Sequence, residues 1–148
     1  MLNTNVFGRL YDDISQNMIL QEALDCLHIF LLSITKPVVI KSSDVLFAEL
    51  TLIKGEAKRE LVLGLVNKIC EERVRLNEQI IELADDIYSI VNDYMDSLHI
   101  SFAATNCTYF VTCDKDIIKN REKIVKLLKS KGFNLNIKNP SEFIKEIK

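Results

Sequence analysis

Short β-branched runs alternate with longer stretches of helical period in this chain, and this alternation constrains the fold more than any other feature. Residues 15–33 repeat apolar side chains at three- and four-residue intervals, at Leu20, Ala23/Leu24, Leu27 and Phe30/Leu31. We predict a helix here, with this face in the core. Val38, Val39 and Ile40 follow as an unbroken β-branched run, which is typical of a strand buried on both faces of a parallel sheet.

The rest of the chain continues the same alternation. Further helices are expected at residues 45–53, 56–70, 77–94, 96–104 and 116–130, and further strands at residues 74–76, 109–113 and 133–137. Residues that start and stop helices fit these bounds: Ser42, Ser43, Asp44 and Asn77 as N-caps, Gly55 and Gly132 as breaks, and Pro140 at the start of a short last helix. The pattern predicts one α/β domain over residues 1–148, a three-layer fold with a short, mainly parallel central sheet flanked by helices.

The net charge of −2 conceals a strong asymmetry along the chain. Residues 55–114 contain 5 basic and 11 acidic side chains, whereas residues 115–148 contain 10 basic and 4 acidic ones. A near-neutral total argues against a strongly basic nucleic-acid binder and against a disordered acidic chain. The division into an acidic middle and a basic tail leaves open a site that needs both signs of charge.

Membrane, secreted and zinc-binding classes are not indicated. Unbroken apolar stretches such as residues 29–32 are far shorter than the ~20 residues of a membrane span, and no signal-peptide pattern opens the chain. The four cysteines contain no CxxC pair, and the two histidines complete no zinc pattern. We therefore expect a cytoplasmic protein with reduced thiols and no membrane partner.

Polar residues follow two of the predicted strands. Asn3, Thr4 and Asn5 come directly after a very short first strand, and Thr112 and Asp114 end the strand at residues 109–113. Functional groups of open parallel sheets gather at the carboxyl ends of strands. If the two strands are neighbours, Asn3 and Asp114 approach each other across one crevice.

Two further acids interrupt apolar surroundings, Glu49 and Asp96. A carboxylate buried without a partner costs several kcal/mol. Taken singly, each acid fits an exposed helix position or an ion pair. Taken with Asp114, they form the kind of oxygen-rich set that binds Mg²⁺ or Mn²⁺ together with a substrate phosphate.

Four segments of the sequence, in order, resemble the signature blocks of PIN domains. They are Leu-Asn-Thr-Asn-Val at residues 2–6, Ser-Ser-Asp-Val-Leu-Phe-Ala-Glu-Leu at 42–50, Asp-Ser-Leu-His-Ile-Ser-Phe-Ala-Ala at 96–104 and Phe-Val-Thr-Cys-Asp-Lys-Asp at 110–116. PIN domains are α/β metal-dependent nucleases, and single copies of this length are similar to the VapC toxins of toxin–antitoxin pairs, which cleave RNA. The resemblance implies a Mg²⁺- or Mn²⁺-dependent endoribonuclease in which water attacks a phosphodiester.

The resemblance also implies roles for individual residues and partners. Glu49, Asp96 and Asp114 would form the acidic metal cluster, Thr4, Asn5 and Thr112 would orient it, and Asp116 would be an outer acid. A homodimer is implied, and an antitoxin inserted near the active site.

The first block departs from the family at Asn3, where PIN domains have aspartate. A carboxamide offers one neutral oxygen and cannot act as a base. We expect the fold to survive and both metal affinity and rate to fall. Two origins of Asn3 stay open, a natural residue and an engineered replacement.

Contacts to RNA are expected from basic residues near these blocks. Arg9 and Lys115 are candidates for phosphate binding, and Lys119, Lys123 and Lys126 continue one side of the basic helix. An exposed loop arginine and an ordinary solvated helix face explain them equally. Two other functions stay open: a non-catalytic PIN-like binding or regulatory module, which Asn3 favours, and a PIN nuclease of RNA maturation with the same site.

Overall fold

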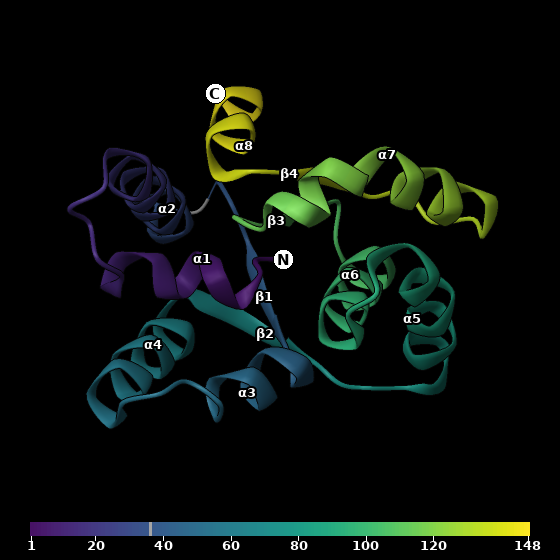
Figure 1. Ribbon diagram of the computed structural model, residues 1–148, viewed down its shortest axis with the longest axis horizontal. Coiled ribbons are helices and arrows are strands. Elements are labelled where there is room, and N and C mark those ends of the chain that lie inside the picture. The colour runs from purple at the N-terminus through teal and green to yellow at the C-terminus, as the bar shows by residue number, and fades with distance from the viewer. Residues whose placement is uncertain (36) are drawn as a thin grey trace.

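The computed structural model describes residues 1–35 and 37–148 and shows a mixed α/β protein that is mostly helical (Figure 1). Helices of at least five residues are α1 (Thr4–Gly8), α2 (Asn17–Ile34), α3 (Asp44–Leu50), α4 (Glu56–Ile69), α5 (Glu78–Val91), α6 (Tyr94–Asn106), α7 (Lys115–Ser130) and α8 (Pro140–Ile147). A single 3₁₀ turn, η1 (Arg9–Tyr11), follows α1. The strands are β1 (Ile40–Ser43), β2 (Cys70–Val74), β3 (Tyr109–Val111) and β4 (Asn136–Lys138).

The strands form two short parallel sheets. β1 pairs with β2, and β3 pairs with β4 in the register Tyr109 to Asn136. Leu2 adds a parallel bridge to Val111, so the beginning of the chain extends the second sheet by one position. The first segment and the strand predicted at 109–113 are therefore neighbours, which is the condition under which Asn3 and Asp114 approach each other.

Helix boundaries follow the residues that the sequence marks as caps. The side chains of Ser43 and Asn77 accept hydrogen bonds from backbone N–H groups at the starts of α3 and α5. Asn139, which precedes Pro140, forms a capping box with Glu142 at the start of α8. Gly55 and Gly132 take φ values of 90° and 86°, a region that favours glycine. These local signals act within one turn, which is why the sequence located most helix ends to within a few residues.

Strand positions were predicted less well, because their burial is not what the sequence pattern suggested. The run at 38–40 becomes a strand only from Ile40, and Val39 is 58% exposed, so burial on both faces was wrong. β2 begins at Cys70, before the predicted 74–76, with exposed residues such as Glu72, which pairs with Lys41. β4 is likewise shorter than the predicted 133–137 and begins later. A strand with polar, exposed side chains carries no apolar alternation to detect.

The apolar interior consists of two clusters on either side of β3. One cluster is built from α5, α6 and α7, with Ile87, Phe102 and Ile124 fully buried. The other joins α1, α2, α4 and α8, and Phe7 stacks on Phe30 with their ring centroids 5.8 Å apart. In Figure 1 the first group lies to the right and the second to the left, so the strands and the residues that follow them lie between two cores.

Helix α2 buries only part of the predicted core face. Ala23 and Phe30 of that face are buried together with Cys26 and Ile29, while its leucines are exposed: Leu20, Leu24, Leu27 and Leu31. Over its 18 residues α2 is also long and apolar enough to cross a membrane. The membrane prediction considered only unbroken apolar stretches, and polar residues interrupt this one. By itself such a helix is weak evidence for a membrane span, because core helices of soluble proteins pass the same test.

Candidate functional site

An open cavity of about 360 Å³ lies where the strands end, and it collects the acids that the sequence singled out. Asn3 follows Leu2, and Asp114 follows β3 as the N-cap of α7. Glu49 comes from α3, the helix after β1, and Asp96 from the first turn of α6. The lining residues are Asn3, Thr4, Asn5, Gly8, Asp12, Glu49, Ile53, Lys58, Asp96 and Asp114.

Thr112 organises the amide side of this cavity from a fully buried position. Its Oγ1 accepts hydrogen bonds from Asn3 Nδ2 at 3.0 Å, from Asn5 Nδ2 at 3.3 Å and from the Asp114 backbone N–H at 3.0 Å. Asn5 Oδ1 in turn accepts from the Cys113 N–H at 3.0 Å. These bonds tie the start of α1 to the end of β3.

The hydrogen bonds around Thr112 also bear on which residue suits position 3. A hydroxyl oxygen has two acceptor lone pairs and one proton, yet three donors converge on Thr112 Oγ1. A carboxylate at residue 3 would accept the Thr112 proton instead of adding a third donor. The surroundings of Asn3 therefore suit an aspartate at least as well as the asparagine.

Asp114 uses one carboxylate oxygen for the fold and keeps the other available. Its Oδ1 accepts from the backbone N–H groups of Asp116 at 2.8 Å and Ile117 at 3.1 Å. This is N-capping, and it places the carboxylate beside the partial positive charge at the start of α7. Asp116 itself is exposed in the first turn of α7 and does not line the cavity.

Glu49 is held by a buried histidine that the sequence analysis did not assign to the site. His99 Nε2 contacts Glu49 Oε1 and lies 3.3 Å from Thr4 Oγ1. The ring is fully buried and stacks on Phe110 at 6.4 Å, and its Nδ1 has no hydrogen-bond partner among the described residues. The spacing of three residues between Asp96 and His99 was a usable signal, because it places both on one face of a helix.

Asp96 shows the electrostatic character of the cavity. Burial is the main cause that raises the pKa of its carboxyl from 3.8 to about 6, and the nearby carboxylates of Asp93, Asp114 and Glu49 contribute to the same rise. Groups that repel one another's charge in this way gain from a bound cation.

The donor set fits a hard divalent cation that keeps part of its water shell. In residues 1–35 and 37–148, no three His, Cys, Asp or Glu side chains converge closely enough to chelate an ion by themselves. Mg²⁺ is commonly bound through one or two carboxylates, several waters and substrate phosphates, so direct chelation by three side chains is not required. The oxygens of Glu49, Asp96 and Asp114 provide donors of the right type.

Two of the predicted substrate contacts lie away from the cavity. Arg9 forms ion pairs with Asp12 at 2.9 Å and Glu22 at 3.0 Å. Lys115 lies beside Met18 of α2, with Nζ 3.7 Å from the thioether sulfur. Neither lines the cavity, because Arg9 is engaged in ion pairs and the Lys115 side chain is drawn toward α2.

Lys58 is the basic residue that does line the cavity, and the sequence analysis missed it. It comes from the first turn of α4, and its Nζ lies 2.8 Å from Asp12 Oδ1. Its position in the sequence, two residues after the first residue of an ordinary amphipathic helix, carries no signal. Only the packing of α4 against α1 brings this ammonium group to the acids.

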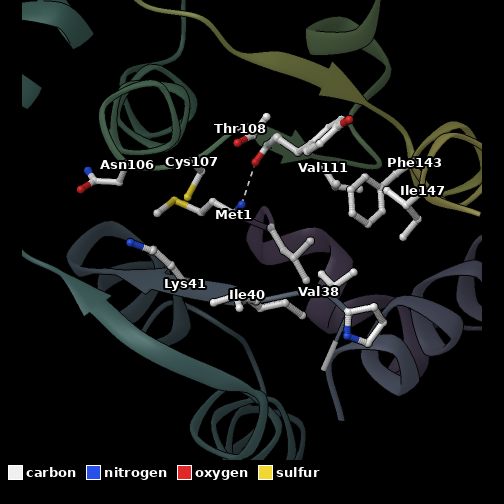
Figure 2. A pocket seen from close by; sticks show the side chains of 14 residues that line it. Met1, Val38, Ile40, Lys41, Asn106, Cys107, Thr108, Val111, Phe143 and Ile147 are labelled. Atoms are coloured by element: carbon white, nitrogen blue, oxygen red, sulfur yellow. Dashed lines mark hydrogen bonds between the residues drawn. The ribbon is translucent and has the colours of Figure 1, made fainter. Parts of the chain in front are cut away.

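A second cavity, of about 330 Å³, lies at the opposite ends of the same strands. Figure 2 shows Ile40, the first residue of β1, and nearby Val38 facing Val111 and Phe143 across this cavity. Its lining is largely apolar, with Lys41, Asn106 and Thr108 among the polar residues. Of these two cavities, the carboxyl-end one is lined by carboxylates, which makes it the candidate functional site.

Comparison with known proteins does not place this chain in a family. No family model matches it, and no curated protein matches it either.

Proposed function

We propose that this protein is a metal-dependent endoribonuclease of the PIN type, similar to the VapC toxins. The observation that carries the proposal is that Glu49, Asp96, Asp114 and Asn3, which lie as much as 111 residues apart in the sequence, line one open cavity. The polar residues expected to orient this cluster are hydrogen-bonded to it, through Thr112 and Asn5. The three-layer PIN arrangement belongs to the same proposal.

The carboxylates of Glu49, Asp96 and Asp114 would hold Mg²⁺ or Mn²⁺. Such an ion lowers the pKa of a water molecule and neutralises charge on phosphate oxygens. Glu49 is fixed by His99, and Asp114 by its capping bonds, so each presents its second oxygen in a set orientation. With the asparagine at position 3, the cluster has one negative charge fewer than a PIN site, which weakens both cation binding and catalysis.

Basic groups around the cavity suit a phosphodiester substrate. Lys58 brings an ammonium group to the lining of the cavity, where it pairs with Asp12 and can also meet a phosphate oxygen. Three further exposed lysines lie along α7, the helix that Asp114 caps: Lys119, Lys123 and Lys126. Lysines three or four residues apart on a helix can contact phosphates without reading base sequence, as expected for the backbone of single-stranded RNA.

Asn3 favours one rival function, a PIN-like module that binds a protein partner such as an antitoxin without cleaving RNA. That module would need neither the carboxylates nor the metal. The proposed nuclease, whether a toxin or an enzyme of RNA maturation, needs both.

The test uses four forms of the full chain: the unsubstituted sequence, Asn3→Asp, Asn3→Asp with Asp96→Asn, and Asn3→Asp with Glu82→Gln. Glu82 is an exposed acid of α5 outside the cavity and serves as the matched control. Each is incubated with single-stranded RNA and Mn²⁺ or Mg²⁺, and with EDTA. We expect Asn3→Asp to cleave at least about 10-fold faster than the unsubstituted sequence, with cleavage lost on EDTA or Asp96→Asn and kept in the control.

Absence of metal-dependent cleavage by Asn3→Asp would refute the nuclease proposal. Cleavage that survives Asp96→Asn would show that a contaminant or another site is responsible.

A further inference from the structure

Helix α2 presents apolar side chains to solvent along the line where a surface helix is normally polar. Five of its exposed residues are leucine or isoleucine, and we call them the α2 stripe: Leu20 (38% exposed), Leu24 (53%), Leu27 (41%), Leu31 (53%) and Ile34 (59%). The core-facing side of the helix is formed by other residues, including Ala23, Ile29 and Phe30. The stripe is therefore surplus to the packing of the monomer.

The spacing of the α2 stripe is that of a coiled-coil seam. Its members are four, three, four and three residues apart, which places them at alternating a and d positions of a heptad. Side chains so spaced form one straight row of knobs, and a second helix with the same spacing supplies the matching holes. In Figure 1 α2 lies at an edge of the molecule, beside α1 and α8, where a second helix has access to its outer side.

We propose that the α2 stripe is the surface through which two copies of this chain associate, α2 against α2 about a two-fold axis. A two-fold interface requires a patch that is complementary to itself. The row of knobs on α2 meets this requirement, because its spacing is nearly symmetric about Leu27. The resemblance to PIN domains leaves the contact face open, whereas the spacing on α2 identifies it independently of the proposed nuclease activity.

The exposed area agrees with a dimer. With about 180 Å² for a fully exposed leucine or isoleucine, the stripe leaves roughly 440 Å² of apolar surface on each copy, the size of the largest, often functional, patch on a monomer. Two stripes contribute about 900 Å², and the exposed neighbours Asn17, Gln21 and Thr35 bring the total above the roughly 1,000 Å² that a stable interface needs.

The charges on α2 favour a second copy over an anionic membrane. The helix contains no lysine or arginine, and its two acids are engaged, Glu22 with Arg9 at 3.0 Å and Asp25 with Gln21 at 3.2 Å. A helix that lies on a lipid surface normally carries basic residues on its polar face. Uncharged side chains flank the stripe instead, so two copies meet without like-charge repulsion across the axis.

The test measures the mass of the full chain in solution by analytical ultracentrifugation between about 1 and 100 µM. We expect the unsubstituted chain to be a dimer in this range. The double variant Leu24→Gln with Leu31→Gln should weaken association at least about 100-fold. Glutamine is a good helix former, so the variant should keep its helical circular dichroism and melting temperature. Leu61→Gln with Ile81→Gln changes two exposed apolar residues of α4 and α5, 54% and 38% exposed, and should stay dimeric.

A second measurement locates the contact. Leu27→Cys lies at the centre of the stripe, and oxidised glutathione should convert it to a covalent dimer far faster than Leu61→Cys.

Three results would overturn the proposal: an unsubstituted chain that is monomeric at 100 µM, a Leu24/Leu31 double variant that remains dimeric, or a control variant that dissociates as much as the double variant does. A monomer that co-sediments with phosphatidylglycerol vesicles through Leu24 and Leu31 would assign the stripe to a lipid surface instead.

Discussion

The two cavities at opposite ends of the strands are similar in size and opposite in chemistry. The carboxyl-end cavity, about 360 Å³, collects Glu49, Asp96 and Asp114, whereas the amino-end cavity, about 330 Å³, is lined largely by apolar side chains. The carboxyl ends of parallel strands lead into helix N-termini, whose partial positive charge stabilises nearby carboxylates. Asp114 caps α7, the helix after β3, and Asp96 lies in the first turn of α6, which follows α5, so two helix N-termini bring acids to this end.

Glu49 differs from these two acids and shows where that rule stops. It lies near the end of α3, where the helix dipole disfavours a negative charge, and it contacts His99 instead. The carboxyl-end site therefore depends on helix N-termini for two acids and on one buried side chain for the third. Four predictions test the comparison between the two ends.

The largest effect is expected from Asp114→Asn in the Asn3→Asp background. Asparagine retains the N-cap of α7 but removes the charge, so stability should change little while RNA cleavage falls about 10³-fold, equivalent to ~4 kcal/mol in the barrier. Initial rates of RNA cleavage with Mn²⁺ check the expected loss of activity, and urea unfolding checks the expected stability. Equal cleavage by the two forms would remove Asp114 from the site.

Ile40→Ala probes the amino end and should produce the reverse pattern. Ile40 is 2% exposed and lines the apolar cavity, so its truncation should lower the free energy of unfolding by about 3 kcal/mol. Mn²⁺ affinity of the folded protein, measured by calorimetry, should not change. A change above about 3-fold would show that the two ends are energetically coupled.

His99→Leu should separate positioning from packing. Loss of the contact to Glu49 should weaken Mn²⁺ binding in the Asn3→Asp background about 10-fold, a common cost for removing a residue that orients a metal ligand. His99→Gln keeps an N–H donor and should recover most of that affinity. The melting temperature should not fall with leucine, because the substitution removes the unpartnered Nδ1 from a buried site. If leucine and glutamine weaken binding equally, His99 does not act through Glu49.

The smallest effect concerns the stability cost of the acidic cavity and its pH dependence. The pKa of Asp96 is raised from 3.8 to about 6 in the folded protein, so folding disfavours its charged form. The cost is absent below about pH 4, grows as pH rises through the window from 4 to 6, and is complete above it. With EDTA present, Asp96→Asn should therefore stabilise the protein by about 1 kcal/mol at pH 7.5 and by nothing at pH 3.5. Glu82→Gln is the control, and an equal gain at both pH values would contradict the assignment.

The sequence located the carboxyl-end acids better than it located the strands that position them. Asn3 and Asp114 were placed at strand ends by the short runs before them, and Asn77 and Gly132 marked helix ends through bonds within one turn. β2 was misplaced because its exposed polar residues show no apolar alternation. Lys58 was missed because its relation to the acids exists only between elements, and the contact of His99 with Glu49 likewise joins α6 to α3.

Helix α2 shows the same division most clearly. The sequence by itself determined that residues 17–34 form a helix, since period, length and composition are properties of the segment alone. The sequence also supplied the α2 stripe, four leucines and Ile34 at alternating intervals of four and three residues. Which of two apolar sides faces the core was decided only by tertiary structure, because α1 and α8 pack on Phe30 and its neighbours and leave Leu24 and Leu31 in solvent. The acidic cavity has the same origin: the sequence provides the carboxylates and the local caps, and packing of distant elements decides which of them share one space.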